Sequence, residues 1–140
     1  MTLERQALMI ANMLLVICLS GIIGLDRERK AERKQSGAAG LRTHILVGMG
    51  ACLFTILSVY AFPDGDTSRV AAQVVSGIGF LGAGVIFVKR DSVRNLTTAA
   101  SIWATAAVGM AVGAGAWLLA IAVTLMIWWV LVIMRRFESK

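Results

Sequence analysis

Hydrophobic positions run in long stretches along the chain and do not alternate with polar ones. Four stretches contain no Asp, Glu, Lys or Arg: residues 7–25, 43–62, 70–88 and 95–134. The first three are 19 or 20 residues long, and as helices each spans about 30 Å, the thickness of a bilayer core. The fourth is long enough for two crossings, with a turn near Gly113 and Gly115. The pattern therefore predicts spans at about 7–25, 43–62, 70–88, 97–113 and 117–134.

Composition supports a membrane protein. Apolar residues make up 58% of the 140 residues and charged residues 16%, against about 25% charged in a typical soluble domain. The first stretch is longer than a typical signal-peptide core and no small-residue cleavage site follows it, so we expect an ordinary span. The predicted fold class is all-α: a polytopic integral membrane bundle of five transmembrane helices. It forms a single transmembrane domain over 1–140, without a soluble carboxyl-terminal domain.

The charges between spans predict the orientation. Six cations lie between the first and second spans, one between the second and third, three between the third and fourth, none in the fourth loop and three in the tail. Cations concentrate on the cytoplasmic side, so the amino terminus is expected outside and the carboxyl terminus in the cytoplasm. This topology explains the net charge of +6, and we expect no nucleic-acid partner because the cations flank spans.

The stretch GIGFLGAG raises the possibility of a nucleotide site, because Gly77, Gly79 and Gly82 fit the G-x-G-x-x-G spacing. That fingerprint requires a preceding strand and an acidic residue about 20 positions later. Here the glycines lie inside a membrane span and Asp91 follows too soon. The nucleotide interpretation therefore fails.

Small residues in the third and fourth spans predict close helix packing instead. Small side chains let helix backbones approach in lipid. The stripe Ala72, Ser76, Gly79 and Ala83 follows helical spacing, and the full packing set is Ala72, Gly77, Gly79, Gly82, Ala83, Gly84, Gly109 and Gly113. We expect spans three and four to pack against each other or against a second copy, giving a homo-oligomer. The alternative is a broken helix that exposes backbone groups to an ion.

Polar residues cluster where the first span ends and the second begins. Asp26 is the acidic residue nearest the bilayer, and Arg42 or His44 is its expected partner. Interfacial anchoring by solvated charges is the alternative. His44 is the only histidine, which excludes a zinc site built from several histidines. The candidate residues here are Asp26, Arg27, Glu28, Arg42, Thr43 and His44.

A second set of polar residues belongs to spans three and four. Arg69, Gln73 and Ser76 share one helical face, which is either a polar patch at the outer mouth or a snorkelling Arg with an interhelical Gln. Thr98 shares a face with Ser101 and Thr105, which indicates interhelical hydrogen bonds or a ligand path. Asn95 or Thr97 is expected to cap span four. The candidates in this set are Arg69, Gln73, Ser76, Asn95, Thr97 and Thr98.

Other chemistry is not indicated. The stretch from Asp64 to Ser68 begins like a calcium loop, but Arg69 and Val75 replace the required Gly and acidic residue, so helix capping is the better interpretation. The sequence contains no Ser-His-acid set, no embedded carboxylate pair and no P-loop. We therefore predict no enzyme, no cofactor and no metal site.

Four stretches together resemble the MgtC/SapB family of bacterial inner-membrane proteins. They are GLDRERK, AGLRTHILVGMGACLF, SRVAAQVVSGIGFLGAGVIF and VRNLTTAASIWATAAVGMAVGAG, and Asn95 replaces an expected Gly. The resemblance implies a five-span domain in the bacterial inner membrane. It also implies a link to growth in low magnesium, intracellular survival of pathogens (virulence) and restraint of the F-type ATP synthase. The residues it singles out are Asp26, Arg27, Glu28, Arg42, Thr43, His44, Arg69, Gln73, Thr97 and Thr98.

Two functions follow as hypotheses. The first is a non-catalytic membrane regulator that contacts a complex such as the F-type ATP synthase through helix faces in the bilayer. The second is a small oligomeric channel or transporter for Mg²⁺ or another ion. No ionisable residue except His44 lies inside a span, whereas ion paths usually carry such groups, so the sequence favours the regulator.

Overall fold

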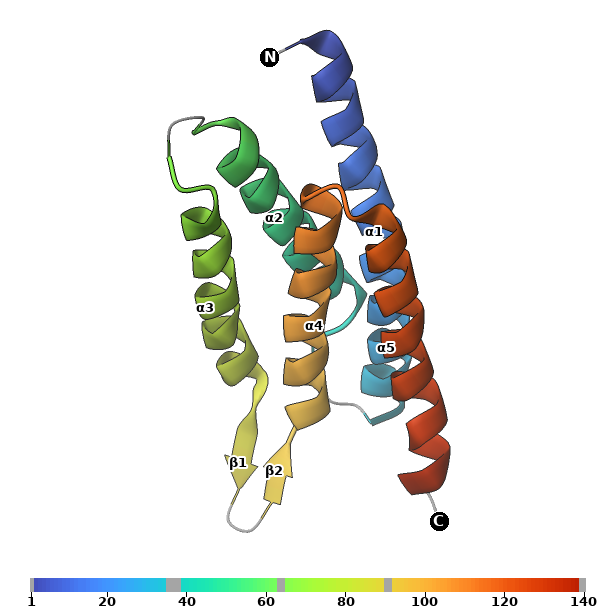
Figure 1. Ribbon diagram of the computed structural model, residues 1–140. Coiled ribbons are helices and arrows are strands. Elements are labelled where there is room, and N and C mark those ends of the chain that lie inside the picture. Colours follow the sequence, from blue (N-terminus) through green and yellow to red (C-terminus); the bar gives the residue numbers. More distant parts are fainter. Residues whose placement is uncertain (1, 35–38, 63–64, 90–91, 139–140) are drawn as a thin grey trace.

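The computed structural model describes residues 2–34, 39–62, 65–89 and 92–138, and they form five helices and one short hairpin (Figure 1). The helices are α1 (Leu3–Lys34), α2 (Leu41–Tyr60), α3 (Ser68–Val85), α4 (Leu96–Gly113) and α5 (Trp117–Glu138). All five contain a stretch long and apolar enough to cross a membrane. The all-α prediction with five spans is confirmed.

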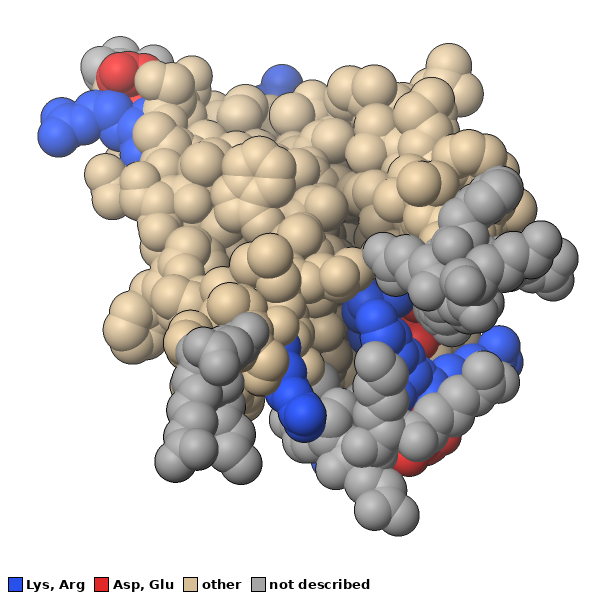
Figure 2. Space-filling model, turned by 90° about the horizontal axis from the view of Figure 1, so that it is seen from below, with Lys and Arg blue, Asp and Glu red and all other residues tan. Residues whose placement is uncertain are grey.

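The two ends of the bundle differ in charge. One end holds the carboxyl end of α1, the start of α2, the hairpin and the end of α5 (Figure 1). We call it the basic end, because it carries Arg27, Arg29, Arg42 and Arg94. Viewed from below in Figure 2, Lys and Arg side chains gather over one part of this end. The opposite end holds the amino terminus and the short α4–α5 turn, in which Gly115 adopts a φ of 80°.

The helices form an inner group and an outer pair. Within its apolar window, α4 has 56% of its residues buried, against 11% each for α3 and α5. Helix α4 contacts every other helix, and α1 and α2 pack on it and on each other. Val16, Cys52, Val108 and Val112 form the closed centre of this inner group. The core therefore lies among α1, α2 and α4.

The G-x-x-x-G motif of α4 packs against α2. A Cβ atom added to Gly113 would lie 2.6 Å from the carbonyl oxygen of Cys52 and 2.9 Å from Cβ of Thr55, and one added to Gly109 would collide with the carbonyl of Gly48. The backbones approach this closely because glycine has no side chain. Gly109 and Gly113 thus bring α4 onto α2, whereas the sequence suggested α3 or a second copy.

Helix boundaries differ from the expected spans at two places. Helix α1 runs through the charged segment to Lys34, well past residue 25. Helix α3 ends at Val85, and the chain then forms strands β1 (Phe87–Lys89) and β2 (Ser92–Arg94), paired antiparallel with Val88 opposite Val93. The expected span to residue 88 is therefore wrong at its end, because β-branched and aromatic residues suit a strand.

Helix α3 is fastened at its ends. At the opposite end, the Ser58 hydroxyl donates to the Thr67 carbonyl. At the basic end, Gly82 lies against Ala99, and the Asn95 amide donates to the Val85 carbonyl at 3.1 Å. Of the small-residue set in α3, Gly82 alone is buried, and the exposed members are Ala72, Ser76, Gly77, Gly79, Ala83 and Gly84. The stripe therefore does not pack against α4 within one chain.

Candidate functional site

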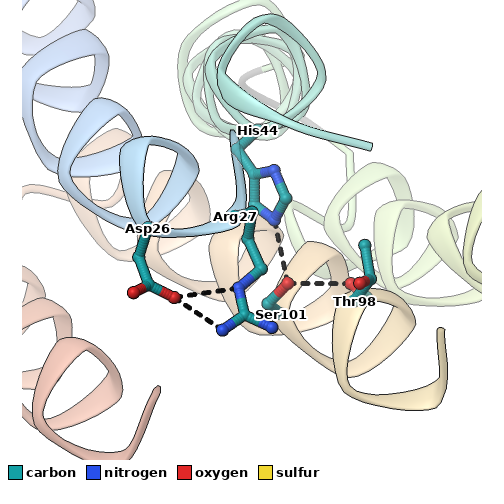
Figure 3. A network of polar contacts seen from close by, with 5 residues as sticks. All are labelled: Asp26, Arg27, His44, Thr98 and Ser101. Carbon is teal, nitrogen blue, oxygen red and sulfur yellow. Dashed lines mark hydrogen bonds and ion pairs between the residues drawn. The ribbon is translucent and has the colours of Figure 1, made fainter. Parts of the chain in front are cut away.

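Five polar residues of α1, α2 and α4 meet near the basic end, and Figure 3 shows their arrangement. They are Asp26, Arg27, His44, Thr98 and Ser101. Four of them are buried in the described structure, which is unusual for polar groups inside a helix bundle. We call these five residues the basic-end cluster.

A buried ion pair forms the α1 part of the cluster. The Arg27 Nη2 and Nε atoms donate to Oδ2 of Asp26 at 2.6 and 3.1 Å. The Arg27 side chain is 2% exposed and that of Asp26 10%. Arg27 Nη1 is buried without a hydrogen-bond partner. A buried cation requires a compensating charge, so the Asp26 carboxylate is what makes the burial of Arg27 tolerable.

Glu28 connects α1 to the start of α2. Its Oε2 atom accepts a hydrogen bond from the Leu41 backbone N–H at 2.7 Å. This N–H belongs to the first turn of α2, where helix geometry leaves donors unsatisfied. A side chain on Gly40 would collide with the Glu28 carboxylate. Glu28 therefore caps α2 from a neighbouring helix, and glycine at position 40 leaves room for it.

His44 links α2 to α4 through both ring nitrogens. Nδ1 lies 2.7 Å from the Gly40 carbonyl oxygen, which only accepts, so Nδ1 carries a proton. Nε2 lies 2.9 Å from the Ser101 hydroxyl, which is also 2.8 Å from the Thr98 carbonyl. The hydroxyl has one hydrogen. It donates either to a neutral His44 or, when Nε2 is protonated, to Thr98.

The other candidates of this region lie apart from the cluster. The expected partners of Asp26 were Arg42 and His44, but Asp26 pairs with Arg27, its own neighbour in α1. Arg42 is exposed, and the ring nitrogens of His44 point to Gly40 and Ser101. Thr43 lies beside a groove between α2 and α3.

The candidates in α3 and at the start of α4 do not join the cluster. Arg69, Gln73 and Ser76 are exposed on α3. Thr97 is exposed, whereas Thr98 is buried one position later. Asn95 precedes α4 with a left-handed φ of 64° and makes no side-chain cap, since its amide bonds back to α3. The sequence placed Asn95 correctly at the helix start but not its hydrogen bond.

Asp66 caps α3, as its sequence position suggested. Its Oδ1 accepts from the Ser68 backbone N–H at 2.9 Å and from the Ser68 hydroxyl at 2.6 Å. These hydrogen bonds, the one from the hydroxyl foremost, lower the pKa of Asp66 below its ordinary value. Asp64 lies outside the described residues. Among the described residues, no group of three His, Cys, Asp or Glu side chains is placed to hold a metal ion.

Three polar residues in the interior were not predicted as sites. Ser101 was noted only as a member of a polar face, yet it is the partner of His44. The side-chain amide oxygen Oδ1 of Asn12 accepts a hydrogen bond at 3.0 Å from the Trp117 indole N–H, which connects α1 to α5. The Ser20 hydroxyl is buried against Gly48 without a hydrogen-bond partner. The sequence signal that could have identified these residues is their position, because each is a polar residue within an apolar stretch.

Comparison with known proteins gives the family. The model of the MgtC family matches residues 13–140. The "Putative magnesium transporter YhiD" of Escherichia coli K12 is 46% identical over 114 residues, which are 76% of this chain and 51% of that protein. Protein MgtC of Brucella abortus is 50% identical over 97 residues, which are 69% of this chain and 39% of that protein. Protein MgtC of Salmonella typhimurium LT2 is 40% identical over 141 residues, and the match covers 99% of this chain and 58% of that protein.

The chain spans about half the length of the curated relatives it matches. No solved structure matches it. The family match covers most of the chain and four of the five helices completely. The two relatives named MgtC are 50% and 40% identical to the chain. The chain belongs to the MgtC family.

Proposed function

We propose that this protein is a non-catalytic, multi-pass regulator in the bacterial inner membrane, with its amino terminus outside and its basic end in the cytoplasm. It acts by contacting a membrane complex through its exposed helix faces. The expected complex, by resemblance to the family, is the F-type ATP synthase, and the expected setting is adaptation to low magnesium during infection.

The observation that carries this proposal is how the buried hydroxyls are satisfied. Thr55, Thr105 and Thr124 donate to the carbonyls of Ala51, Ser101 and Ala120, each four residues earlier in its own helix, at 2.7–2.8 Å. Each of these three residues is also shielded from water, with at most 5% of its surface exposed. The charged side chains of the basic-end cluster lie at one end of the bundle, so the described residues supply no water-accessible polar path through the middle of one chain.

The exposed faces of the outer helices are the second observation that supports the regulator proposal. Helices α3 and α5 leave most of their apolar windows uncovered by the chain itself. Large apolar side chains such as Phe80, Leu118 and Trp129 are exposed. In a bilayer these faces contact lipid or other helices, and helix association there depends on packing. A regulator of a membrane complex requires surface of this kind.

The test uses inverted membrane vesicles with and without the protein. ATP hydrolysis and ATP-driven acidification are followed together. A regulator that restrains the synthase lowers both rates. An ion leak collapses the gradient while hydrolysis stays level or rises, and that result would contradict the proposal. Thr105→Val is the matched variant: it removes an interior hydroxyl without altering any outer face, so a regulator keeps its effect.

Transport of Mg²⁺ is the second candidate, favoured by the name of the Escherichia coli relative, which includes "magnesium transporter". It requires a path formed by several copies, because no path is built within the described part of one chain. Uptake of Mg²⁺ into protein-containing liposomes tests it directly. Uptake that exceeds the rate in empty liposomes would replace the regulator proposal.

A further inference from the structure

A groove separates α2 and α3 along most of their length. Its volume is about 600 Å³. It runs from Thr43 to Phe54 on α2 and from Val70 to Leu81 on α3, with Ala106 of α4 also lining it. Hydrogen bonds hold α3 at its two ends, Ser58–Thr67 and Asn95–Val85. Between them, buried Val47, Ala51 and Ile78 pack together and line the groove.

The lining of the groove is apolar and lacks side chains at two positions. Among the described residues that line it, Thr43 and Gln73 are the polar members. A Cβ added to Gly50 or to Gly77 would meet no atom within 4 Å. Empty space beside packed atoms forfeits dispersion contacts on one side. In a membrane this groove is therefore filled by something apolar from the bilayer.

The size of the groove suits a single hydrocarbon chain. Its lining extends over eleven residue steps on α2, about 16 Å at 1.5 Å per residue. A flexible acyl chain fits along this length and into the open space beside Gly50 and Gly77.

Charge at one end indicates how such a chain is anchored. Gln73 lines the groove, and Arg69 lies one helical turn before it on the same face of α3, exposed at the opposite end of the bundle. A cation at the interface attracts a phosphate group. The apolar groove and Arg69 together match a molecule with a phosphate head and a hydrocarbon tail.

We propose that the α2–α3 groove binds one phospholipid, with an acyl chain beside Gly50 and Gly77 and the phosphate at Arg69. The bound chain completes the packing between α2 and α3. The proposal is independent of the regulatory function, since a regulator or a transporter is equally able to hold a lipid in this groove.

The test counts the phospholipids retained by the whole protein. The protein is reconstituted in vesicles of phosphatidylethanolamine and phosphatidylglycerol, extracted in mild detergent and weighed by native mass spectrometry. Gly77→Leu adds a side chain to the lining of the groove, and its Cβ atom would have no neighbour within 4 Å. Gly79→Leu is its matched control, because Gly79 also has open space around it but does not line the groove.

The wild type and Gly79→Leu are expected to retain one phospholipid, and Gly77→Leu to reduce the bound fraction at least about tenfold. Arg69→Gln is expected to weaken retention, whereas Arg42→Gln, at the basic end, leaves it unchanged. Equal retention in Gly77→Leu and Gly79→Leu overturns the proposal. A dimer that only Gly77→Leu dissociates also overturns it, because the groove is then a protein interface. Loss in Arg42→Gln alone overturns the assignment of the phosphate to Arg69.

Discussion

The imidazole Nε2 of His44 lies 2.9 Å from the hydroxyl oxygen of Ser101, and this hydrogen bond joins α2 to α4 near the end where both helices begin. Both residues are buried. The same histidine holds the Gly40 carbonyl through Nδ1. One side chain therefore fixes the start of α2 and its contact with α4.

His44→Leu is expected to destabilise the bundle by about 1–3 kcal/mol, because it leaves the Gly40 carbonyl and the Ser101 hydroxyl without their shared partner. Ser101→Ala is expected to cost about 1 kcal/mol, since the bond to Gly40 remains. Unfolding in mixed micelles measures both. The double variant should show a coupling of at least about 0.5 kcal/mol. Strictly additive effects would indicate that the two side chains do not interact.

Gly113→Ala is expected to destabilise the protein by about 1–3 kcal/mol, because the new methyl group has to displace the α2 backbone at Cys52. Gly79→Ala is the control. Its added methyl group meets open space, and alanine is preferred over glycine inside a helix by about 0.5–1 kcal/mol. The same micelle unfolding experiment compares them. Equal losses in the two variants would argue against close α2–α4 packing.

Asp26→Asn is expected to destabilise the protein by about 3–5 kcal/mol, because it leaves the buried Arg27 guanidinium without its carboxylate. Glu32→Gln is the matched control, since Glu32 is exposed on the same helix, and its effect should stay within about 0.5 kcal/mol. Thermal unfolding in detergent compares the two. A small effect of Asp26→Asn would show that the ion pair contributes little.

Titration of Asp66 is expected to make the stability of the folded protein depend on pH. Its pKa is lowered in the folded protein by the hydrogen bonds from Ser68, so the charged carboxylate favours the folded state. This contribution is complete above the ordinary carboxyl pKa of about 3.9 and is lost as the pH falls through the lowered value. The Ser68 amide resonance should follow that titration. In Asp66→Ala the titration should disappear, and its persistence would assign the resonance change to another group.

Orientation is tested by reporters fused at each end of the protein. The cations of the basic end predict that a carboxyl-terminal reporter is active in the cytoplasm and an amino-terminal reporter outside. Replacing Arg29 and Arg42 with Gln should weaken this preference, because both residues are exposed cations of the basic end. Equal activity of both reporters in both compartments would show dual insertion and refute the orientation.

The sequence was sufficient to predict the helices, because a membrane span depends on local length and apolarity. It did not reveal the β1–β2 hairpin, since Phe87 and Val88 are as apolar as the span before them. It predicted correctly that α3 and α4 pack against each other, but it did not identify α2 as the neighbour of the α4 glycines, because spacing identifies a face as small and not which helix lies against it. Tertiary geometry decided that Gly109 and Gly113 meet α2.

The site was predicted in part for the same reason. The charges and His44 were identified because such groups are rare near a membrane core. The pairing of Asp26 with Arg27, and of Glu28 with the Leu41 N–H, depends on how α1 and α2 meet, and sequence spacing does not contain that information. The sequence placed Ser101 on a polar face that indicates interhelical hydrogen bonds, but it did not identify His44 as the partner.

The division into an inner group and an outer pair has a consequence for mutational tolerance. Outward positions of α3 and α5 contribute little to folding, because few of their residues are covered by the rest of the chain. Sensitivity to substitution at those positions would therefore report on what the protein touches, whereas sensitivity in α4 would report on whether it folds. A complete substitution scan scored for activity and for abundance separates these two kinds of position, and so maps the contact surface even while the partner is unidentified.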